Sequence, residues 1–297
     1  MLPLAYDFSK LPDSIKNKVV HEKSNYSFGW SHGKEILQEG KFDTHKGSYY
    51  NNPQYDVPTK SEEMISKFPE SCLPNVWPDD DFPQLRPAFM ELGQLMVNVG
   101  TLVAKQCDIY SKKVLGDKYN TQLEDIIKES KTCKARLLYY FPIDDDKPRS
   151  RDSWCGWHND HGSLTGLCSA YYIDEQNNTK DIPCPDTEAG LYCKTRNGKE
   201  FKVKIPKDCI AFQIGESSQV VTGGVLRATP HAVQALSWPE SKTIGRSTFA
   251  VFMQPDNNVV MRLPEGSDES KVEVGQYTRD MTFAEFNKAT IAKYYTE

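Results

Sequence analysis

The clearest periodic signal in the chain is helical and begins near residue 84. Apolar residues recur there at spacings of three and four, at Leu85, Phe89, Leu92, Leu95, Met96, Val99, Leu102, Val103 and Tyr110. Because an α-helix turns once every 3.6 residues, such a recurrence is typical of one helix with an apolar side. The pattern predicts a long amphipathic helix over about 84–113.

Two further helices are indicated by their start signals. Thr121 and Glu124, and later Thr282 and Glu285, have the Thr-x-x-Glu spacing of a capping box. They predict a short helix over about 121–130 and a C-terminal helix that ends near Tyr295. Residues 1–80 are rich in Pro, Tyr, Asn and Gly. That segment is therefore expected to be irregular, with short helices such as SEEMISKF.

After residue 134 the pattern changes to short apolar runs. Each run is bounded by Gly, Pro, Asn or Asp, and together they read ARLLYYF, LCSAYYI, GLYCK, EFKVKI, CIAFQI, SQVV, VLRA, AVQAL, STFAVFMQ and VVMRL. Asn197-Gly198 is a strong signal for a two-residue hairpin between two of them. No helix-length period separates the runs, so a parallel sheet is disfavoured. The pattern predicts a mainly β fold of the sandwich or jelly-roll kind with flanking helices.

Composition and charge narrow the function classes. The chain has 297 residues, with 36 basic and 41 acidic side chains, so its formal charge is −5. That length is enough for one core, and a single domain over 1–297 is expected. No basic cluster predicts a nucleic-acid partner, and no run of about 20 apolar residues predicts a membrane span. Without a signal peptide, the expected location is cytoplasmic.

The eight cysteines contain no C-x-x-C pair, which disfavours a zinc ribbon or an iron–sulfur site. Metal-capable side chains are densest around residue 158. In an extended strand, residues i and i+2 share a face, so His158 and Asp160 converge while His161 points away. A third candidate, His231, lies 71 residues after Asp160 at the start of another predicted strand. Two imidazoles and one carboxylate leave positions open on Fe(II) for a co-substrate and O₂, whereas zinc-dependent hydrolysis is the rival use.

Arg246 and Thr248 favour the oxygenase interpretation over the hydrolytic one. They begin a strand that is expected to pair with the strand starting at His231. A guanidinium next to a hydroxyl is a good clamp for the far carboxylate of a dicarboxylic acid. A 2-oxo acid held in this way could chelate the metal with its other end. The alternative for Arg246 is an ordinary surface ion pair.

These motifs together resemble a known family. The run His-x-Asp-His-Gly-x-Leu-Thr from His158, the later Thr-Pro-His-x-Val and the Arg-x-Thr at Arg246 are similar to those of the iron(II)/2-oxoglutarate-dependent dioxygenases, isopenicillin N synthase-like family. The resemblance covers about residues 134–263 and implies a double-stranded β-helix, a cupin-like jelly roll. The implied layout is an N-terminal irregular and helical region over 1–133, a jelly-roll catalytic core over 134–263 and a C-terminal helical segment over 264–297.

The resemblance also implies roles for individual residues. His158, Asp160 and His231 would hold Fe(II), while Arg246 and Thr248 would bind the 5-carboxylate of 2-oxoglutarate. Tyr139 stands where the family often has an Asn that touches the 2-oxo acid, because Tyr139-Tyr140-Phe141-Pro142 corresponds to the family's Asn-Tyr-Tyr-Pro.

The implied reaction is oxidation of a small organic metabolite by O₂. It would proceed as hydroxylation, desaturation or cyclisation, with release of succinate and CO₂ and with ascorbate as a possible supporting reductant. No obligate protein partner is evident. Two alternatives remain: an Fe(II) oxidase of the same fold that uses no 2-oxoglutarate, and a non-catalytic jelly-roll binding protein.

Overall fold

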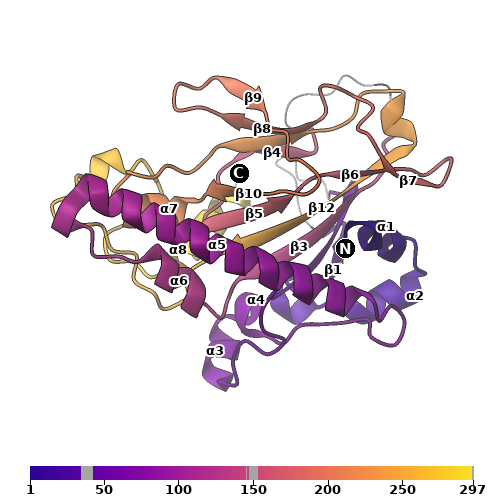
Figure 1. The fold of residues 1–297 in the computed structure, drawn as a ribbon. Coiled ribbons are helices and arrows are strands. Elements are labelled where there is room, and N and C mark those ends of the chain that lie inside the picture. Colours follow the sequence, from indigo (N-terminus) through magenta and orange to yellow (C-terminus); the bar gives the residue numbers. More distant parts are fainter. Residues whose placement is uncertain (35–42, 145, 147–152, 296–297) are drawn as a thin grey trace.

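The computed structural model describes residues 1–34, 43–144, 146 and 153–295 (Figure 1). Its helices are α1 (Leu2–Ser9), α2 (Asp13–Lys16), α3 (Glu62–Lys67), α4 (Pro69–Cys72), α5 (Leu85–Leu115), α6 (Leu123–Glu129), α7 (Glu216–Val221) and α8 (Phe283–Tyr295). Its strands are β1 (Gly29–His32), β2 (Lys46–Asn51), β3 (Lys134–Tyr140), β4 (Cys155–His158), β5 (Leu164–Cys168), β6 (Tyr171–Asp174), β7 (Thr179–Ile182), β8 (Gly190–Lys194), β9 (Glu200–Lys202), β10 (Ile210–Ile214), β11 (His231–Gln234) and β12 (Ile244–Met253). No helix of the described chain is both long and apolar enough to cross a membrane.

The larger of two antiparallel sheets is organised around β12. Within the described residues its strand order is β1-β2-β3-β12-β5-β10. Along one edge β12 pairs with β3 from Arg246 to Phe252. Along the other edge its first half pairs with β6 and its second half with β5. Ten residues of one strand therefore connect the two halves of this sheet, and Arg246 and Thr248 lie on that strand.

The smaller sheet has the order β4-β11-β8-β9 and lies opposite the larger one (Figure 1). Two antiparallel sheets stacked face to face, with helices outside, confirm the predicted mainly β fold with flanking helices. One expected pairing is wrong. The strand of His231 pairs with β4 and β8, whereas the strand of Arg246 pairs with β3, β5 and β6. The two strands face each other across the sandwich and are not neighbours in one sheet.

The long helix is confirmed, but its apolar pattern covers two different faces. α5 packs on β5, β10 and β12 and buries Leu85, Phe89 and Met96. The ring of Phe89 contacts that of Phe249 edge-on at 5.1 Å between centroids. By contrast, Leu95 and Leu102 are more than half exposed on the outer side. The spacing of apolar residues does not distinguish the buried face from the exposed face, so one apolar side was predicted where the helix has two.

Several predicted strands were wrong. The run SQVV is part of helix α7, VLRA forms no strand, and VVMRL contributes only an isolated bridge between Val260 and Thr282. Residues 217–221 of α7 are all buried, so this part of the helix has no exposed face. Its sequence therefore lacks the helical period by which a surface helix is predicted. Conversely, β1 and β2 lie in the segment predicted to be irregular, and both extend the larger sheet beyond the expected jelly-roll span of 134–263.

The predicted capping boxes had different outcomes. At α8, Thr282 Oγ1 accepts a hydrogen bond from the Glu285 backbone and Glu285 accepts from the Thr282 backbone, as expected. At α6, the cap comes from α5 instead. The Asp108 carboxylate accepts hydrogen bonds from the backbone N–H groups of Leu123 and Glu124 at 2.8 and 2.9 Å. Asp108 therefore fastens the short helix to the long one.

We expect Asp108→Ala to lower the free energy of unfolding by about 1–3 kcal/mol, because it removes this cap and a hydrogen bond from Tyr119. Urea denaturation checks the change. Asp117→Ala is the matched control, since Asp117 is exposed and pairs only with Lys112 among the described residues. Equal midpoints for the two variants would contradict the role of Asp108.

Candidate functional site

The three predicted metal ligands come together at one end of the smaller sheet. His158 ends β4 and His231 begins β11, and the two residues are direct partners in the antiparallel pairing of these strands. Their rings lie 4.2 Å apart, and Asp160 follows two residues after His158. One ligand atom from each residue lies within 4.8 Å of the others. Within the described residues, this is the one group of three or more such side chains that could hold a metal ion.

The carboxylate of Asp160 is buried and its two oxygens have different surroundings. Oδ2 accepts hydrogen bonds from Thr165 Oγ1 and Gln213 Nε2, both at 2.6 Å. Oδ1 faces the Nε2 atoms of His158 and His231, at 3.8 and 3.9 Å. Two hydrogen bonds hold one oxygen, so the other is left for a cation between the imidazoles.

Backbone carbonyls orient both imidazoles. Nδ1 of His158 lies 2.7 Å from the carbonyl oxygen of Gly156, and Nδ1 of His231 lies 3.0 Å from that of Thr229. Since a carbonyl only accepts, Nδ1 carries a proton in each ring, and in a neutral ring the lone pair for a metal is on Nε2. Both Nε2 atoms face Oδ1 of Asp160, and that of His231 also lies 3.1 Å from Gln213 Nε2.

The surroundings of the three groups shift their pKa values in different directions, so the groups differ in charge at pH 7. Burial would raise the pKa of Asp160, but His231, His158 and the two hydrogen bonds outweigh it and hold that pKa below its usual value. Burial lowers the pKa of His231, which is therefore neutral at pH 7. At His158 burial is outweighed by Cys155 and Asp160, which raise its pKa to about 9. Without a cation, the cluster thus keeps a proton on His158.

Arg246 is buried on β12 and has no ion-pair partner among the described residues, so it forms no surface ion pair. Its guanidinium carbon lies 5.0 Å from the ring centre of Tyr140 and 5.7 Å from that of Trp154. Its Nε and Nη1 are buried without a hydrogen-bond partner in the described part of the chain. A buried cation with two unused donors is costly unless an anion occupies the adjoining space.

The adjoining space is a cavity of about 500 Å³ between the two sheets. Arg246 and Thr248 line it together with His158, Asp160 and His231. Much of the remaining wall is apolar and includes Leu138, Leu167, Ile182, Leu191, Val203, Ile205, Val233 and Phe252. Such a cavity can hold a dicarboxylate between the guanidinium and the His-Asp-His cluster.

Tyr139 does not lie in this cavity, contrary to the role expected for it. It is fully buried on the other face of β3, and its hydroxyl donates to Glu175 Oε1 at 2.6 Å. Because side chains alternate along a strand, its neighbours Leu138 and Tyr140 line the cavity instead. Tyr140 is also the direct cross-strand partner of Arg246.

Sequence reasoning missed Thr165 and Gln213, which hold Asp160. Thr165 stands in the motif that was recognised, but nothing in the sequence indicates that its hydroxyl reaches back to Asp160. Gln213 lies in an apolar run, and the only indication of its role in the sequence is that its side chain is polar. His161 points away from the cluster as expected. Its ring stacks on that of Phe283, with 6.0 Å between the ring centroids.

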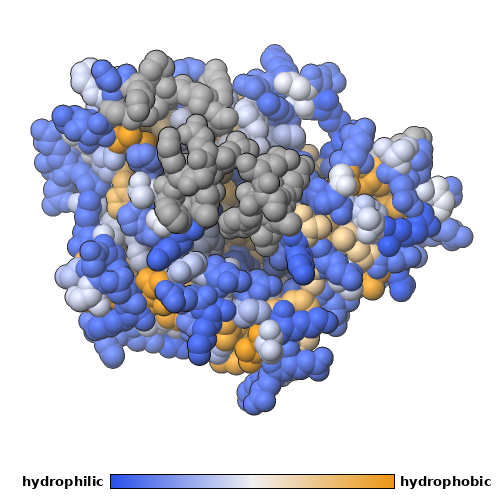
Figure 2. Space-filling model, turned by 180° about the vertical axis from the view of Figure 1, so that it is seen from behind, coloured by the Kyte–Doolittle hydropathy of each residue, from blue (hydrophilic) through white to orange (hydrophobic). Residues whose placement is uncertain are grey.

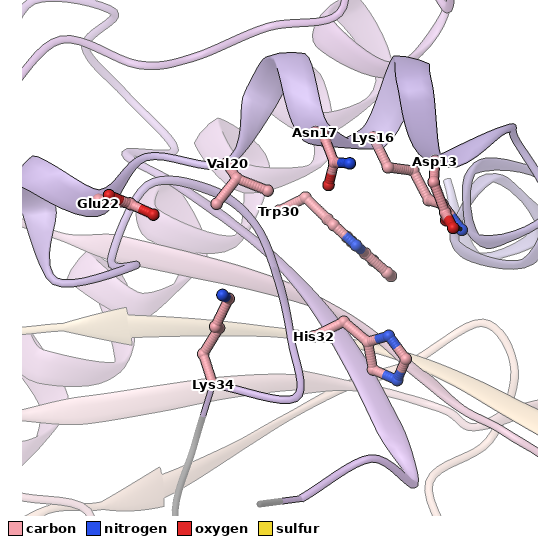
Figure 3. A pocket seen from close by; sticks show the side chains of 8 residues that line it. All are labelled: Asp13, Lys16, Asn17, Val20, Glu22, Trp30, His32 and Lys34. Carbon is pink, nitrogen blue, oxygen red and sulfur yellow. Dashed lines mark ion pairs between the residues drawn. The ribbon is translucent and has the colours of Figure 1, made fainter.

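A second cavity of about 470 Å³ lies between α2 and β1 (Figure 3). Side chains from both sides face into it, among them Lys16, Asn17, Trp30 and His32. His32 Nε2 lies 3.0 Å from the carbonyl oxygen of Thr44. The two cavities share no lining residue, so His32 belongs to neither the cluster nor its cavity.

Among the comparisons with known proteins, only the one with solved structures finds similar proteins. No protein-family profile and no curated sequence matches the chain. Among solved structures, a protein assigned to the 2OG-Fe(II) oxygenase family from Caulobacter crescentus superposes with a TM-score of 0.71 at 19% identity, covering 97% of this chain and 83% of that one. A full-length Neurospora crassa protein in complex with alpha-KG gives 0.62 at 17% identity, covering 97% and 80%. JOX2 in complex with 2OG, Fe and JA gives 0.59 at 15% identity, covering 95% and 70%.

The likeness extends over nearly the whole chain at low identity, so it establishes the fold. The expected jelly roll with flanking helices is confirmed. The His-Asp-His cluster and the buried arginine are features of this chain's own coordinates, and they are independent of the superposition.

We expect Arg246→Met to leave the ligand-free protein at least as stable as the wild type, with a gain of up to about 2 kcal/mol. The substitution removes a buried charge that lacks a counter-ion. Chemical denaturation of the ligand-free protein measures this. Arg136→Met is the control, because the Arg136 guanidinium bonds Ser48 and covers the Tyr50 ring, and its loss should destabilise. A clear loss of stability in Arg246→Met would identify Arg246 as a structural residue.

Proposed function

We propose that the protein is a non-haem Fe(II)- and 2-oxoglutarate-dependent oxygenase that oxidises a small organic molecule. The observation that carries the proposal is the shared cavity. It joins two imidazole Nε2 atoms and one carboxylate oxygen on one side to a buried guanidinium with two unused donors on the other. Two neutral nitrogens and one oxygen suit Fe(II) with open coordination positions.

Each residue has a defined task in this proposal. His158, Asp160 and His231 hold the metal from one side, and Thr165 and Gln213 keep Asp160 in place. When bound, Fe(II) and 2-oxoglutarate would supply the oxidising chemistry: 2-oxoglutarate, O₂ and a C–H bond are converted to succinate, CO₂ and an alcohol.

Arg246 and Thr248 bind the distal carboxylate of 2-oxoglutarate. The apolar walls limit water around the reacting centre, which favours the coupled reaction over side reactions. Ascorbate would act only as a supporting reductant.

The substrate is a small organic molecule with an apolar part. The cavity volume and the apolar wall support this class. Several basic side chains, Arg136, Lys202, Lys204 and Lys207, also border the cavity. Among the solved structures of the same fold, the Neurospora crassa protein has been captured with 5-formyluracil and JOX2 with JA, so small molecules occupy those proteins. Hydroxylation is the simplest outcome, and desaturation or cyclisation would use the same residues.

Succinate formation tests the proposal. Purified protein with Fe(II), ascorbate, 2-oxoglutarate and O₂ should release succinate, and a panel of candidate substrates should increase the rate. Asp160→Ala should reduce succinate to the protein-free background, because Oδ1 is lost from the metal site. No succinate from the wild type despite bound Fe(II) would favour the same-fold oxidase that uses no 2-oxoglutarate. Failure to bind Fe(II) or Mn(II) would favour a non-catalytic binding protein.

Arg246→Ala separates the two halves of the site. In calorimetry, the affinity for 2-oxoglutarate should fall on the order of 100-fold while Mn(II) binding persists, because only the carboxylate clamp is removed. Arg279→Ala is the control, since Arg279 is an exposed arginine paired with Glu269. Equal affinities in the two variants would remove Arg246 from the site.

The pKa of about 9 at His158 predicts how metal binding depends on pH. Below pH 9 His158 is protonated in the metal-free protein, and a metal must displace this proton. We expect release of about one proton per Mn(II) at pH 7, and an affinity that increases with pH up to about 9. Calorimetry in buffers of different ionisation enthalpy counts the protons. A binding heat that does not depend on the buffer would contradict the assignment of His158.

A further inference from the structure

The outward face of α5 is apolar in a regular pattern. Its inner face buries Leu85, Phe89 and Met96 against the larger sheet, as described above. On the opposite side Leu95, Leu102 and Ile109 are 51%, 62% and 56% exposed. In Figure 1 the helix crosses the near side of the molecule with no other element in front of it. Seen from behind, the molecule is mainly hydrophilic, with hydrophobic side chains in scattered spots (Figure 2).

The three exposed residues are spaced seven apart, so they lie along one side of the helix. Leu92 and Val99, on the same side, are half-buried, and Leu92 packs against the core. A seven-residue repeat of exposed apolar side chains is typical of a helix that packs against another helix. Single exposed apolar residues are common, but three in a line from Leu95 to Ile109, about 21 Å long at 1.5 Å per residue, are characteristic of a contact surface.

We propose that this stripe pairs with the same stripe of a second copy of the chain, with the two α5 helices antiparallel and a two-fold axis at Leu102. In that arrangement Leu102 meets Leu102 of the partner subunit, and Leu95 meets Ile109 of the partner subunit. The same patch on both subunits makes a closed, isologous dimer. The occupant is a second copy because Leu95, Leu102, Ile109 and the charges at the two ends match one another when the helix is reversed about Leu102.

The charges select the antiparallel direction. Glu91 lies at one end of the stripe, while Lys112 and Lys113 lie at the other. An axis at Leu102 places Glu91 opposite Lys113 of the partner subunit, because 91 and 113 are equally distant from 102. A parallel pair would instead bring Glu91 to Glu91 of the partner subunit and lysine to lysine. Glu91 and Lys113 make no ion pair within the described chain, so both are available for the contact.

The proposed interface is separate from the proposed active site. No residue of α5 lines the cavity that contains the His-Asp-His cluster. Variants of the stripe should therefore leave metal and 2-oxoglutarate binding unchanged. This independence lets the dimer be tested without reference to the oxygenase proposal.

Sedimentation velocity tests the dimer directly. A single helix pair buries less than a standard interface, so we expect dissociation in the micromolar range and a dimer at about 200 µM. Leu102→Glu should weaken the dimer by about 100-fold or more, because two carboxylates would face each other at the axis. Val57→Glu is the matched control, since Val57 is 51% exposed outside the helix.

Thermal unfolding of Leu102→Glu at a concentration where the wild type is monomeric establishes that the variant is folded. A wild type that stays monomeric at about 200 µM would overturn the proposal. A dimer that Leu102→Glu leaves intact would overturn it equally.

Cross-linking tests the direction of the helices in a Cys209→Ser background, which removes a native exposed thiol. In the antiparallel dimer, a mixture of Leu95→Cys and Ile109→Cys proteins forms a disulfide between unlike chains, whereas neither protein alone does. Cross-linking of Leu95→Cys with itself would contradict the antiparallel arrangement. Glu91→Lys should weaken the dimer about two- to fivefold, and Glu91→Lys with Lys113→Glu should restore it.

Discussion

The carboxylate of Asp160 is the interaction on which the site depends. It is buried, so its charge requires partners, and these come from both sheets. Thr165 on β5 and Gln213 on β10 donate to Oδ2 from the larger sheet, while the imidazoles of the smaller sheet face Oδ1. The same contacts that satisfy the charge therefore fix the distance between the sheets at this end of the cavity. Arg246 completes the cavity from β12.

The elements that sequence predicted well are those with local signals. The long helix over 85–115 shows a sustained helical period, and α8 has a genuine capping box. The convergence of His158 and Asp160 follows from the two-residue repeat of an extended chain. His231 was a candidate ligand at the start of a predicted strand, the resemblance implied its role at the metal, and the register of β11 with β4 brings it next to His158.

What sequence could not predict depends on contacts between distant segments. The strands of His231 and Arg246 belong to different sheets, because β12 finds its partners in β3, β5 and β6. The cap of α6 comes from Asp108, fifteen residues upstream of Leu123. Tyr139 was expected at the 2-oxo acid, but the alternation along β3 turns it to the other face. The exposed stripe of α5 was assigned to the same apolar side as its buried residues, because spacing does not distinguish an inner from an outer face.

The central proposal is that one cavity binds a metal at the His-Asp-His cluster and a dicarboxylate at Arg246. The most direct test is an anaerobic crystal structure with Mn(II) and 2-oxoglutarate, with manganese located by its anomalous scattering. We predict a single manganese position between Nε2 of His158, Nε2 of His231 and Oδ1 of Asp160, with the distal carboxylate of 2-oxoglutarate on the Arg246 guanidinium. Manganese bound elsewhere, or 2-oxoglutarate bound without contact to Arg246, would contradict the claim.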